Sequence, residues 1–156
     1  GIKKARPFLD DNEPFLVHNA DILSDINLAE LYRHHRESNA EATLLVSQRQ
    51  TSRYLLLDDA NRLHGWINKS TGETKPEGFS FQERQYKEMA FGGIHVISPS
   101  LFRYMESRQW EGKFSIIPFY LSVCETACIQ GYPLQDRRWF DIGKPETLAK
   151  AEEYYR

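Results

Sequence analysis

The first part of the chain alternates a short apolar run, an amphipathic segment and a second apolar run, and this pattern constrains the fold most. Residues Pro14–His18 and Ala42–Ser47 have the length and composition of buried, parallel-type strands. Between them, apolar residues recur from Leu28 at helical spacing, and Asp25 or Asn27 can cap that helix. A strand, a helix and a strand in this order predict a βαβ unit and therefore an α/β fold.

The rest of the chain predicts a β-hairpin followed by alternating strands and helices. Residues 54–57 and 63–67 are apolar runs that flank a turn-rich linker at 58–62, as in a hairpin. Residues 70–80 are mostly polar and contain glycines and a proline, which predicts an exposed loop. Further strands are expected at 87–97, 129–132 and 138–140, and further helices at about 98–106, about 114–126 and from 144, the last with an apolar stripe of Leu148, Ala151 and Tyr155. The predicted class is α/β, with a mixed, mainly parallel sheet flanked by helices and a β-hairpin insertion.

The composition fits one folded domain and excludes several classes of partner. With 156 residues, 40% of them hydrophobic, the chain has enough apolar material for one core, and a single domain over 1–156 is predicted. Its 20 basic and 22 acidic residues give a net charge of −2, so neither nucleic acid nor a membrane surface is predicted as a partner. No apolar run is long enough to span a bilayer and no signal pattern is visible, which predicts a cytoplasmic protein. Cys124 and Cys128 are expected to be reduced thiols.

Two aspartates follow predicted strands and are candidate metal ligands. Asp21 comes just after the apolar run that ends at His18, and α/β sheets bind ligands at the carboxyl ends of their parallel strands. Asp141 follows the aromatic pair Trp139–Phe140, so a fold that gathers strand ends could bring the two carboxylates together. Mg²⁺ is commonly held by one or two carboxylates together with substrate phosphates and water. From the residues alone, a turn or helix-cap residue is the more common role for Asp21, and a turn residue for Asp141.

Three segments, taken in order and with their spacing, resemble one protein family. They are Phe15–Asp21 (FLVHNAD), Phe91–Ile97 (FGGIHVI) and Trp139–Pro145 (WFDIGKP). They resemble the sugar-phosphate nucleotidylyltransferases, whose members activate phosphates of mannose, glucose, N-acetylglucosamine or N-acetylmuramic acid. Gly1–Ala5 resembles the stretch that follows the mid-domain glycines of that family, so the resemblance covers nearly the whole chain. It implies the C-terminal portion of a Rossmann-like domain, in which Asp21 and Asp141 are the catalytic, Mg²⁺-binding pair.

The resemblance also implies a set of substrate-binding residues. Asn19 belongs to the Asn-x-Asp motif, and Gly93 to a glycine pair that lines the sugar pocket in the family; a β-bulge is the alternative reason for Gly93. Where the family often has Glu-Lys-Pro, this chain has Asn68 in place of the glutamate, followed by Lys69. The resemblance implies that the Asn68 amide binds the sugar hydroxyls and that Lys69 binds a phosphate. A second alignment places the motif at Glu73–Pro76. In both alignments a solvated loop lysine is the alternative.

The implied reaction transfers a nucleotidyl group from a nucleoside triphosphate to a sugar 1-phosphate and releases pyrophosphate, as in nucleotide-sugar synthesis for cell-envelope polysaccharides. The family's nucleotide-binding loop, which is glycine-rich and contains an arginine, has no counterpart in this sequence. We therefore expect an incomplete nucleotidyltransferase domain that is inactive alone and self-associates through an exposed sheet edge. Uridylyl transfer to an amino-sugar phosphate and guanylyl transfer to mannose 1-phosphate are the leading alternatives.

Two other classes of protein compete with this interpretation. A non-catalytic regulatory or interaction domain could keep the same fold without the activity. A metal-dependent glycosyltransferase also uses nucleotide sugars, but such enzymes usually carry an Asp-x-Asp motif at the metal. Asp21 and Asp25 are too widely spaced for that motif.

Overall fold

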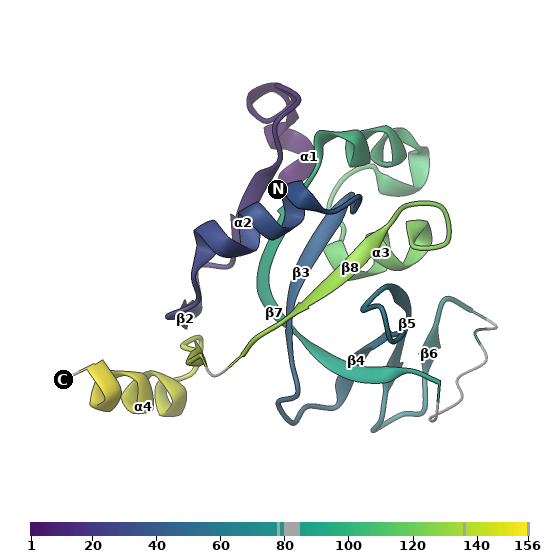
Figure 1. The fold of residues 1–156 in the computed structure, drawn as a ribbon. Coiled ribbons are helices and arrows are strands. Elements are labelled where there is room, and N and C mark those ends of the chain that lie inside the picture. The colour runs from purple at the N-terminus through teal and green to yellow at the C-terminus, as the bar shows by residue number, and fades with distance from the viewer. Residues whose placement is uncertain (78, 80–84, 136, 156) are drawn as a thin grey trace.

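The computed structural model describes residues 1–77, 79, 85–135 and 137–155, and its centre is a seven-stranded sheet with helices on both faces (Figure 1). The strands are β1 (Phe15–His18), β2 (Ile22–Ser24), β3 (Ala42–Ser47), β4 (Arg53–Leu57), β5 (Leu63–Asn68), β6 (Thr74–Lys75), β7 (Lys87–Ile97), β8 (Ile129–Pro133) and β9 (Trp139–Asp141). The α-helices are α1 (Ile2–Ala5), α2 (Leu28–Glu37), α3 (Ile116–Val123) and α4 (Pro145–Tyr155), and the 3-10 helices are η1 (Arg6–Phe8), η2 (Pro99–Glu106) and η3 (Arg108–Trp110). None of the helices in the described residues is long and apolar enough to cross a membrane.

Strand β7 organises the sheet. The strand order is β6-β5-β4-β7-β3-β8, and β1 also pairs with β7. Strands β1, β3 and β4 are each antiparallel to β7, while β8 is parallel to β3. Five strands (β1, β3, β4, β6 and β8) therefore run in one direction, since β6 is antiparallel to β5 and β5 to β4. Most of the described pairings are nevertheless antiparallel, because β7 lies between β1, β3 and β4. The predicted mixed α/β fold with flanking helices is confirmed. Most of its strands run in the same direction, but most neighbouring strands are antiparallel to one another.

The predicted hairpin is present. Strands β4 and β5 pair antiparallel with Tyr54 opposite Ile67 and Leu57 opposite Leu63. Asn61 adopts a left-handed conformation in the connecting turn, with φ of 63°, which asparagine tolerates better than most residues. The predicted loop at 70–80 contains the short strand β6, which pairs with β5. Residues 78 and 80 of that loop lie outside the described residues.

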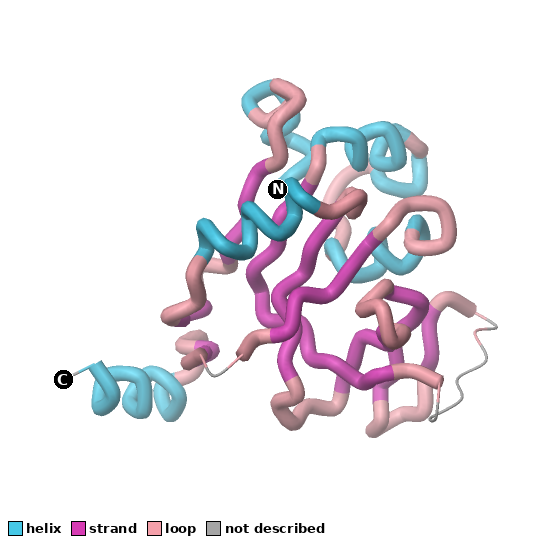
Figure 2. The backbone as a smooth tube through the Cα atoms, viewed as in Figure 1, coloured by secondary structure: helices cyan, strands magenta, loops and turns pink. Residues whose placement is uncertain are grey.

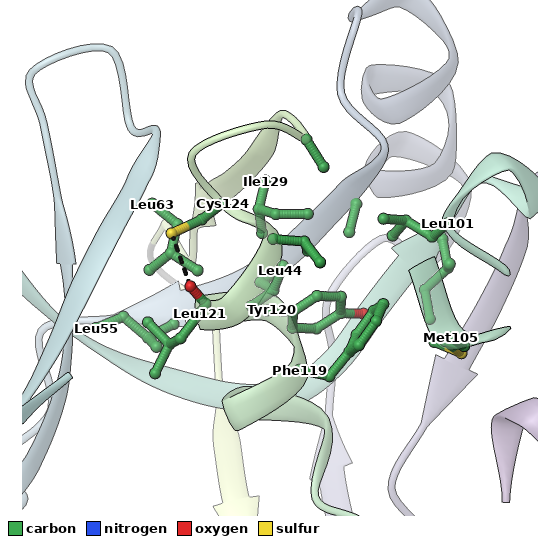
Figure 3. Close-up of a cluster of buried hydrophobic side chains, with 14 of the residues drawn as sticks. Leu44, Leu55, Leu63, Leu101, Met105, Phe119, Tyr120, Leu121, Cys124 and Ile129 are labelled. Carbon is green, nitrogen blue, oxygen red and sulfur yellow. Dashed lines mark hydrogen bonds between the residues drawn. The ribbon is translucent and has the colours of Figure 1, made fainter. Parts of the chain in front are cut away.

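The alternating side chains of β3 divide the core into two parts. Leu44 and Val46 belong to the larger cluster, together with residues of η2 and α3 such as Phe119. Leu45 points to the opposite face and packs in the smaller cluster with Leu31 of α2. Figure 3 shows the larger cluster, in which the side chains of α3 fill the space over the sheet. Burying each large apolar side chain contributes about 1.5–3 kcal/mol to folding.

Both cysteines are free thiols, as expected. Cys124 is buried in the larger cluster, where its Sγ lies 3.3 Å from the carbonyl oxygen of Leu121 (Figure 3). Cys128 is partly exposed. Burial raises the pKa of the Cys124 thiol, which keeps it protonated and unreactive at neutral pH.

Helix α2 begins where the sequence predicts. Of the two candidate caps, Asn27 is the one used, because its side-chain oxygen accepts a hydrogen bond from the backbone N–H of Glu30 at 3.1 Å. Leu31 and His35 form the buried face of the helix. His35 is held there by hydrogen bonds to the hydroxyl of Thr43 at 2.8 Å and to that of Ser98.

The C-terminal segment differs from the sequence prediction in two ways. Strand β9 pairs with β2 in a separate two-stranded sheet, and β2 was not predicted at all. Figure 2 shows this small sheet apart from the main one, next to α4. The predicted apolar stripe lies on α4, but only Ala151 of its three members is buried, while Leu148 and Tyr155 are 40% and 51% exposed.

Candidate functional site

The chain brings Asp21 and Asp141 together through the β2–β9 pair. A tight turn follows β1, in which the Ile22 N–H donates to the carbonyl of Asn19 at 3.1 Å. Strand β2 then pairs antiparallel with β9, placing Ile22 opposite Asp141. The Ile142 N–H donates to the carbonyl oxygen of Asp21 at 2.8 Å, which fixes the two loops to one another.

The two carboxylates converge on the space beside Gly143. A Cβ atom built on Gly143 would lie 3.1 Å from Asp141 Oδ1 and 3.5 Å from Asp21 Oδ2. Both aspartates are exposed to solvent, and Asp141 Oδ1 also accepts a hydrogen bond from the Gly143 N–H at 3.1 Å. Ionised carboxylates only accept hydrogen bonds and repel one another, so two that face one space favour a bound cation.

This donor set fits Mg²⁺ better than it fits a transition metal. The described residues contain no group of three or more His, Cys, Asp or Glu side chains that could hold a metal by themselves. Mg²⁺ does not need such a group, because one or two carboxylates suffice when substrate phosphates and water complete the octahedron. Asp21 and Asp141 could therefore contribute two carboxylate ligands to such an ion.

Asn19 and Gly93 also lie next to each other. The Asn19 N–H donates to the Gly93 carbonyl at 2.9 Å, and a Cβ atom on Gly93 would lie 3.0 Å from the side-chain nitrogen of Asn19. Gly93 has φ of 73°, and the β3–β7 register shifts between Leu44 and Val46, opposite this glycine. A bulge and a close approach of Asn19 therefore explain why a glycine is needed here.

A pocket of about 840 Å³ opens beside the carboxylate pair. It is lined by Asp141 and, from the hairpin side, by Asn68, Glu73 and Lys75. Lys69 is not among the lining residues; its Nζ is 2.6 Å from Glu88 Oε1. The structure therefore places Asn68 at the pocket together with Asp141. The lysine that lines the pocket is Lys75, from the second alignment, and not Lys69.

Lys75 is held in place at the pocket by two neighbours. Its Nζ lies 5.1 Å from the ring centre of Trp66 and 3.3 Å from Glu73 Oε1. An ammonium group over an indole face is attracted by the ring quadrupole. The short strand β6 positions this lysine by pairing it with Trp66 of β5.

Sequence reasoning missed Arg49, which lines the same pocket. Its guanidinium lies over the ring of Trp139 at 4.5 Å and donates to the carbonyl of Phe91 at 3.2 Å. Partial burial lowers the pKa of Arg49, and the negative charge of Asp141 opposes this shift. An arginine stays protonated in proteins in any case, so Arg49 brings a fixed positive charge to the pocket. No motif marks this loop residue, and its aromatic partner is distant in sequence.

The buried histidines lie outside this pocket. His95 of β7 shares a 2.6 Å hydrogen bond with the hydroxyl of Tyr120 in the core. Burial lowers the pKa of His95 to about 4 and raises the pKa of Tyr120, so both side chains are neutral at pH 7. His35 is also neutral, since burial and the nearby His34 lower its pKa to about 4.

An α/β sheet with paired carboxylates beyond a strand end, next to a pocket lined with cationic side chains, is typical of proteins that bind phosphorylated ligands. A family model described as Nucleotidyl transferase matches residues 1–156, and the chain belongs to this family. The resemblance to sugar-phosphate nucleotidylyltransferases is thereby confirmed.

Curated relatives support the same family. The mannose-1-phosphate guanylyltransferase catalytic subunit beta of Danio rerio is 26% identical over 149 residues, which are 92% of this chain and 37% of the relative. The probable mannose-1-phosphate guanylyltransferase 3 of Arabidopsis thaliana is 24% identical over 149 residues, 94% of this chain and 40% of the relative. The chain thus spans about two fifths of the length of these relatives.

Solved structures share the fold. The UTP-bound UGPase from Acinetobacter baumannii has a TM-score of 0.73 at 15% identity, covering 99% of this chain and 54% of that one. The inositol-1-phosphate CTP transferase from T. maritima has a TM-score of 0.69 at 19% identity, covering 97% of this chain and 58% of that one. These likenesses establish the architecture of the sheet and its helices.

Proposed function

We propose that this chain supplies the metal-binding and sugar-phosphate-binding part of an enzyme that transfers a nucleotidyl group to a sugar 1-phosphate. The observation that carries the proposal is the convergence of Asp21 and Asp141 beside Gly143, at the edge of a pocket lined with cations. Family membership supplies the reaction type. Mannose 1-phosphate is the first substrate to test, because the named relatives are mannose-1-phosphate guanylyltransferases.

The geometry suits a reaction that needs no protein base. The nucleophile is an oxygen of the sugar 1-phosphate, which is already anionic, and it attacks the α-phosphorus of the triphosphate while pyrophosphate leaves. Binding and charge neutralisation are then the main tasks of the protein. Asp21 and Asp141 would hold Mg²⁺, which would neutralise phosphate charge when bound. Lys75 would bind a phosphate and Asn68 the sugar hydroxyls, both from the pocket wall.

We propose that this chain holds the nucleotide incompletely. The 156-residue sequence contains no glycine-rich, arginine-containing loop of the family type. We propose that these residues alone bind metal and sugar phosphate without turning over nucleotide. Steady pyrophosphate release by the chain with Mg²⁺, GTP and mannose 1-phosphate would contradict this part of the proposal.

The test is a Mn²⁺ titration followed by paramagnetic resonance, with and without mannose 1-phosphate. We expect Asp21→Asn and Asp141→Asn each to weaken Mn²⁺ binding by about tenfold or more. Asp59→Asn is the matched control, because Asp59 is an exposed carboxylate in the β4–β5 turn, outside the pocket lining. If the wild-type chain binds neither Mn²⁺ nor the sugar phosphate, the chain is better described as a regulatory or interaction domain.

A further inference from the structure

Arg49 is oriented by two neighbouring groups. Its guanidinium lies 4.5 Å from the ring centre of Trp139 and donates to the Phe91 carbonyl at 3.2 Å. Trp139 is itself fixed, since its indole N–H donates to the Gly92 carbonyl at 2.8 Å. An arginine held by stacking and one hydrogen bond loses little side-chain freedom when it binds a further group.

The remaining donors of Arg49 are available to an anion. A guanidinium has five N–H groups, and the described structure gives Arg49 one hydrogen bond, to Phe91. Among the described residues, no carboxylate oxygen forms an ion pair with Arg49 within 4.0 Å. Asp141 acts on Arg49 only as a nearby charge. This differs from Lys75 on the hairpin side of the pocket, which is already paired with Glu73 at 3.3 Å.

We propose that Arg49 is a phosphate-binding residue, whose guanidinium receives a phosphate group of the substrate beside the Asp21–Asp141 pair. The planar fork of arginine matches two oxygens of a phosphate, and such charged hydrogen bonds are stronger than neutral ones. Arg49 and Asp141 line one pocket, so a phosphate drawn to the carboxylate-held cation lies within the same space as the guanidinium. This inference rests on the proposed function for the origin of the phosphate, which belongs either to the sugar 1-phosphate or to the nucleotide.

The experiment measures binding of three phosphate probes to the 156-residue chain by calorimetry in the presence of Mg²⁺. The probes are inorganic phosphate, mannose 1-phosphate and GTP, and the variants are Arg49→Gln and Arg49→Lys. We expect Arg49→Gln to weaken binding of the phosphate probe by about 10- to 100-fold. Arg49→Lys should weaken binding less, since lysine keeps the positive charge but lacks the planar, two-pronged guanidinium. Arg33→Gln on the exposed face of α2 is the control and should bind as the wild type does. A Mn²⁺ titration without phosphate should be unchanged or tighter in Arg49→Gln, because the variant removes a positive charge near Asp141.

The outcomes separate this inference from the proposed function. A loss with mannose 1-phosphate places Arg49 on the sugar phosphate, and a loss with GTP alone places it on the nucleotide; either supports the inference. If all three probes need Arg49 but mannose 1-phosphate binds no more tightly than inorganic phosphate, Arg49 is a phosphate site and the proposed sugar substrate is wrong. If Arg49→Gln binds every probe as the wild type does, or the wild type binds none, the inference is overturned.

Discussion

The backbone N–H of Ile142 donates a hydrogen bond to the carbonyl oxygen of Asp21 at 2.8 Å. The two residues are 121 positions apart in the sequence, yet this bond ties the turn after β1 to the loop after β9. Together with the β2–β9 pairing, it holds both carboxylates beside Gly143. The candidate metal site is therefore a property of two loops held together by main-chain bonds.

Gly143→Ala should weaken binding of Mg²⁺ while leaving both aspartates in place. The new Cβ atom would lie 3.1 Å from Asp141 Oδ1 and 3.5 Å from Asp21 Oδ2, in the space where the cation is expected. We expect a loss of affinity of about 10-fold or more, as for other changes next to metal ligands. Titration with Mn²⁺ measures it, and a melting curve checks the fold. Unchanged affinity would place the cation elsewhere.

Gly93→Ala should destabilise the protein more than Gly72→Ala does. Both glycines have positive φ, 73° and 74°, so both alanines carry a backbone penalty of about 1 kcal/mol. Only at Gly93 would the Cβ meet other atoms, 2.9 Å from Ile22 and 3.0 Å from Asn19, which adds roughly 1–3 kcal/mol of overpacking. Urea unfolding of the two variants measures the difference. Equal losses would mean that Asn19 and Ile22 move away without cost.

Lys75→Gln should weaken binding of mannose 1-phosphate, and Lys69→Gln should not. Lys75 lines the pocket, whereas Lys69 is paired with Glu88 outside the pocket lining. The expected loss for Lys75→Gln is about tenfold, the size of one charged hydrogen bond. Calorimetry on the two variants decides between the two alignments of the family's Glu-Lys-Pro motif. The reverse result would restore Lys69 as the phosphate ligand.

The free energy of unfolding should fall between pH 6.5 and pH 4. The pKa of His95 is about 4 in the folded chain and 6.5 in the unfolded chain, so the unfolded state binds the extra proton in this range. Stability is therefore fully present above pH 6.5 and is lost as the pH falls, by roughly 3 kcal/mol for this residue below pH 4. His95→Gln should flatten the pH dependence, leaving the His35 contribution. A pH dependence in His95→Gln as steep as in the wild type would contradict this prediction.

Strand β1 should promote self-association through its outer edge. In the described structure β1 pairs with β7 on one side. The Asn19 N–H donates to β7, and in an antiparallel pair the backbone groups of alternate residues face the partner strand. The outward groups of the exposed residue His18 are then open to another strand. Light scattering should show a mass that rises with concentration, and His18→Lys should reduce the rise. A constant monomer mass for the wild type would disprove the prediction.

Local patterns predicted most of the main sheet. The apolar runs at β3 and β7, the β4–β5 hairpin and the capped helix α2 all carry their signals within a few neighbouring residues. Strand β2 is only three residues long and exists because it pairs with β9. No local pattern could reveal it, since its partner is more than a hundred residues away. For the same reason the exposure of Leu148 and Tyr155 on α4 was not foreseen: helical spacing marks an apolar face but not whether anything covers it.

The site shows the same division. Asp21, Asp141 and Asn19 were marked by motifs at strand ends, and Gly93 by a glycine pair within β7. The structure brings these residues together as the pairs Asp21–Asp141 and Asn19–Gly93. Arg49 had no such signal, because its importance comes from stacking on Trp139, ninety positions later. The choice between Lys69 and Lys75 also depended on tertiary structure, since β6 turns one of them toward the pocket.

The central place of β7 has a consequence for how the chain folds. Strands β1, β3 and β4 are all synthesised before residues 87–97, but each of them pairs with that strand. Until β7 leaves the ribosome, the β4–β5 hairpin is the main local structure that the earlier strands can form. A sheet that depends on such distant pairings folds slowly, because loop closure has to precede the stabilising contacts. The apolar strands are exposed during that interval, so the yield of folded protein should depend on chaperones or on a low rate of synthesis.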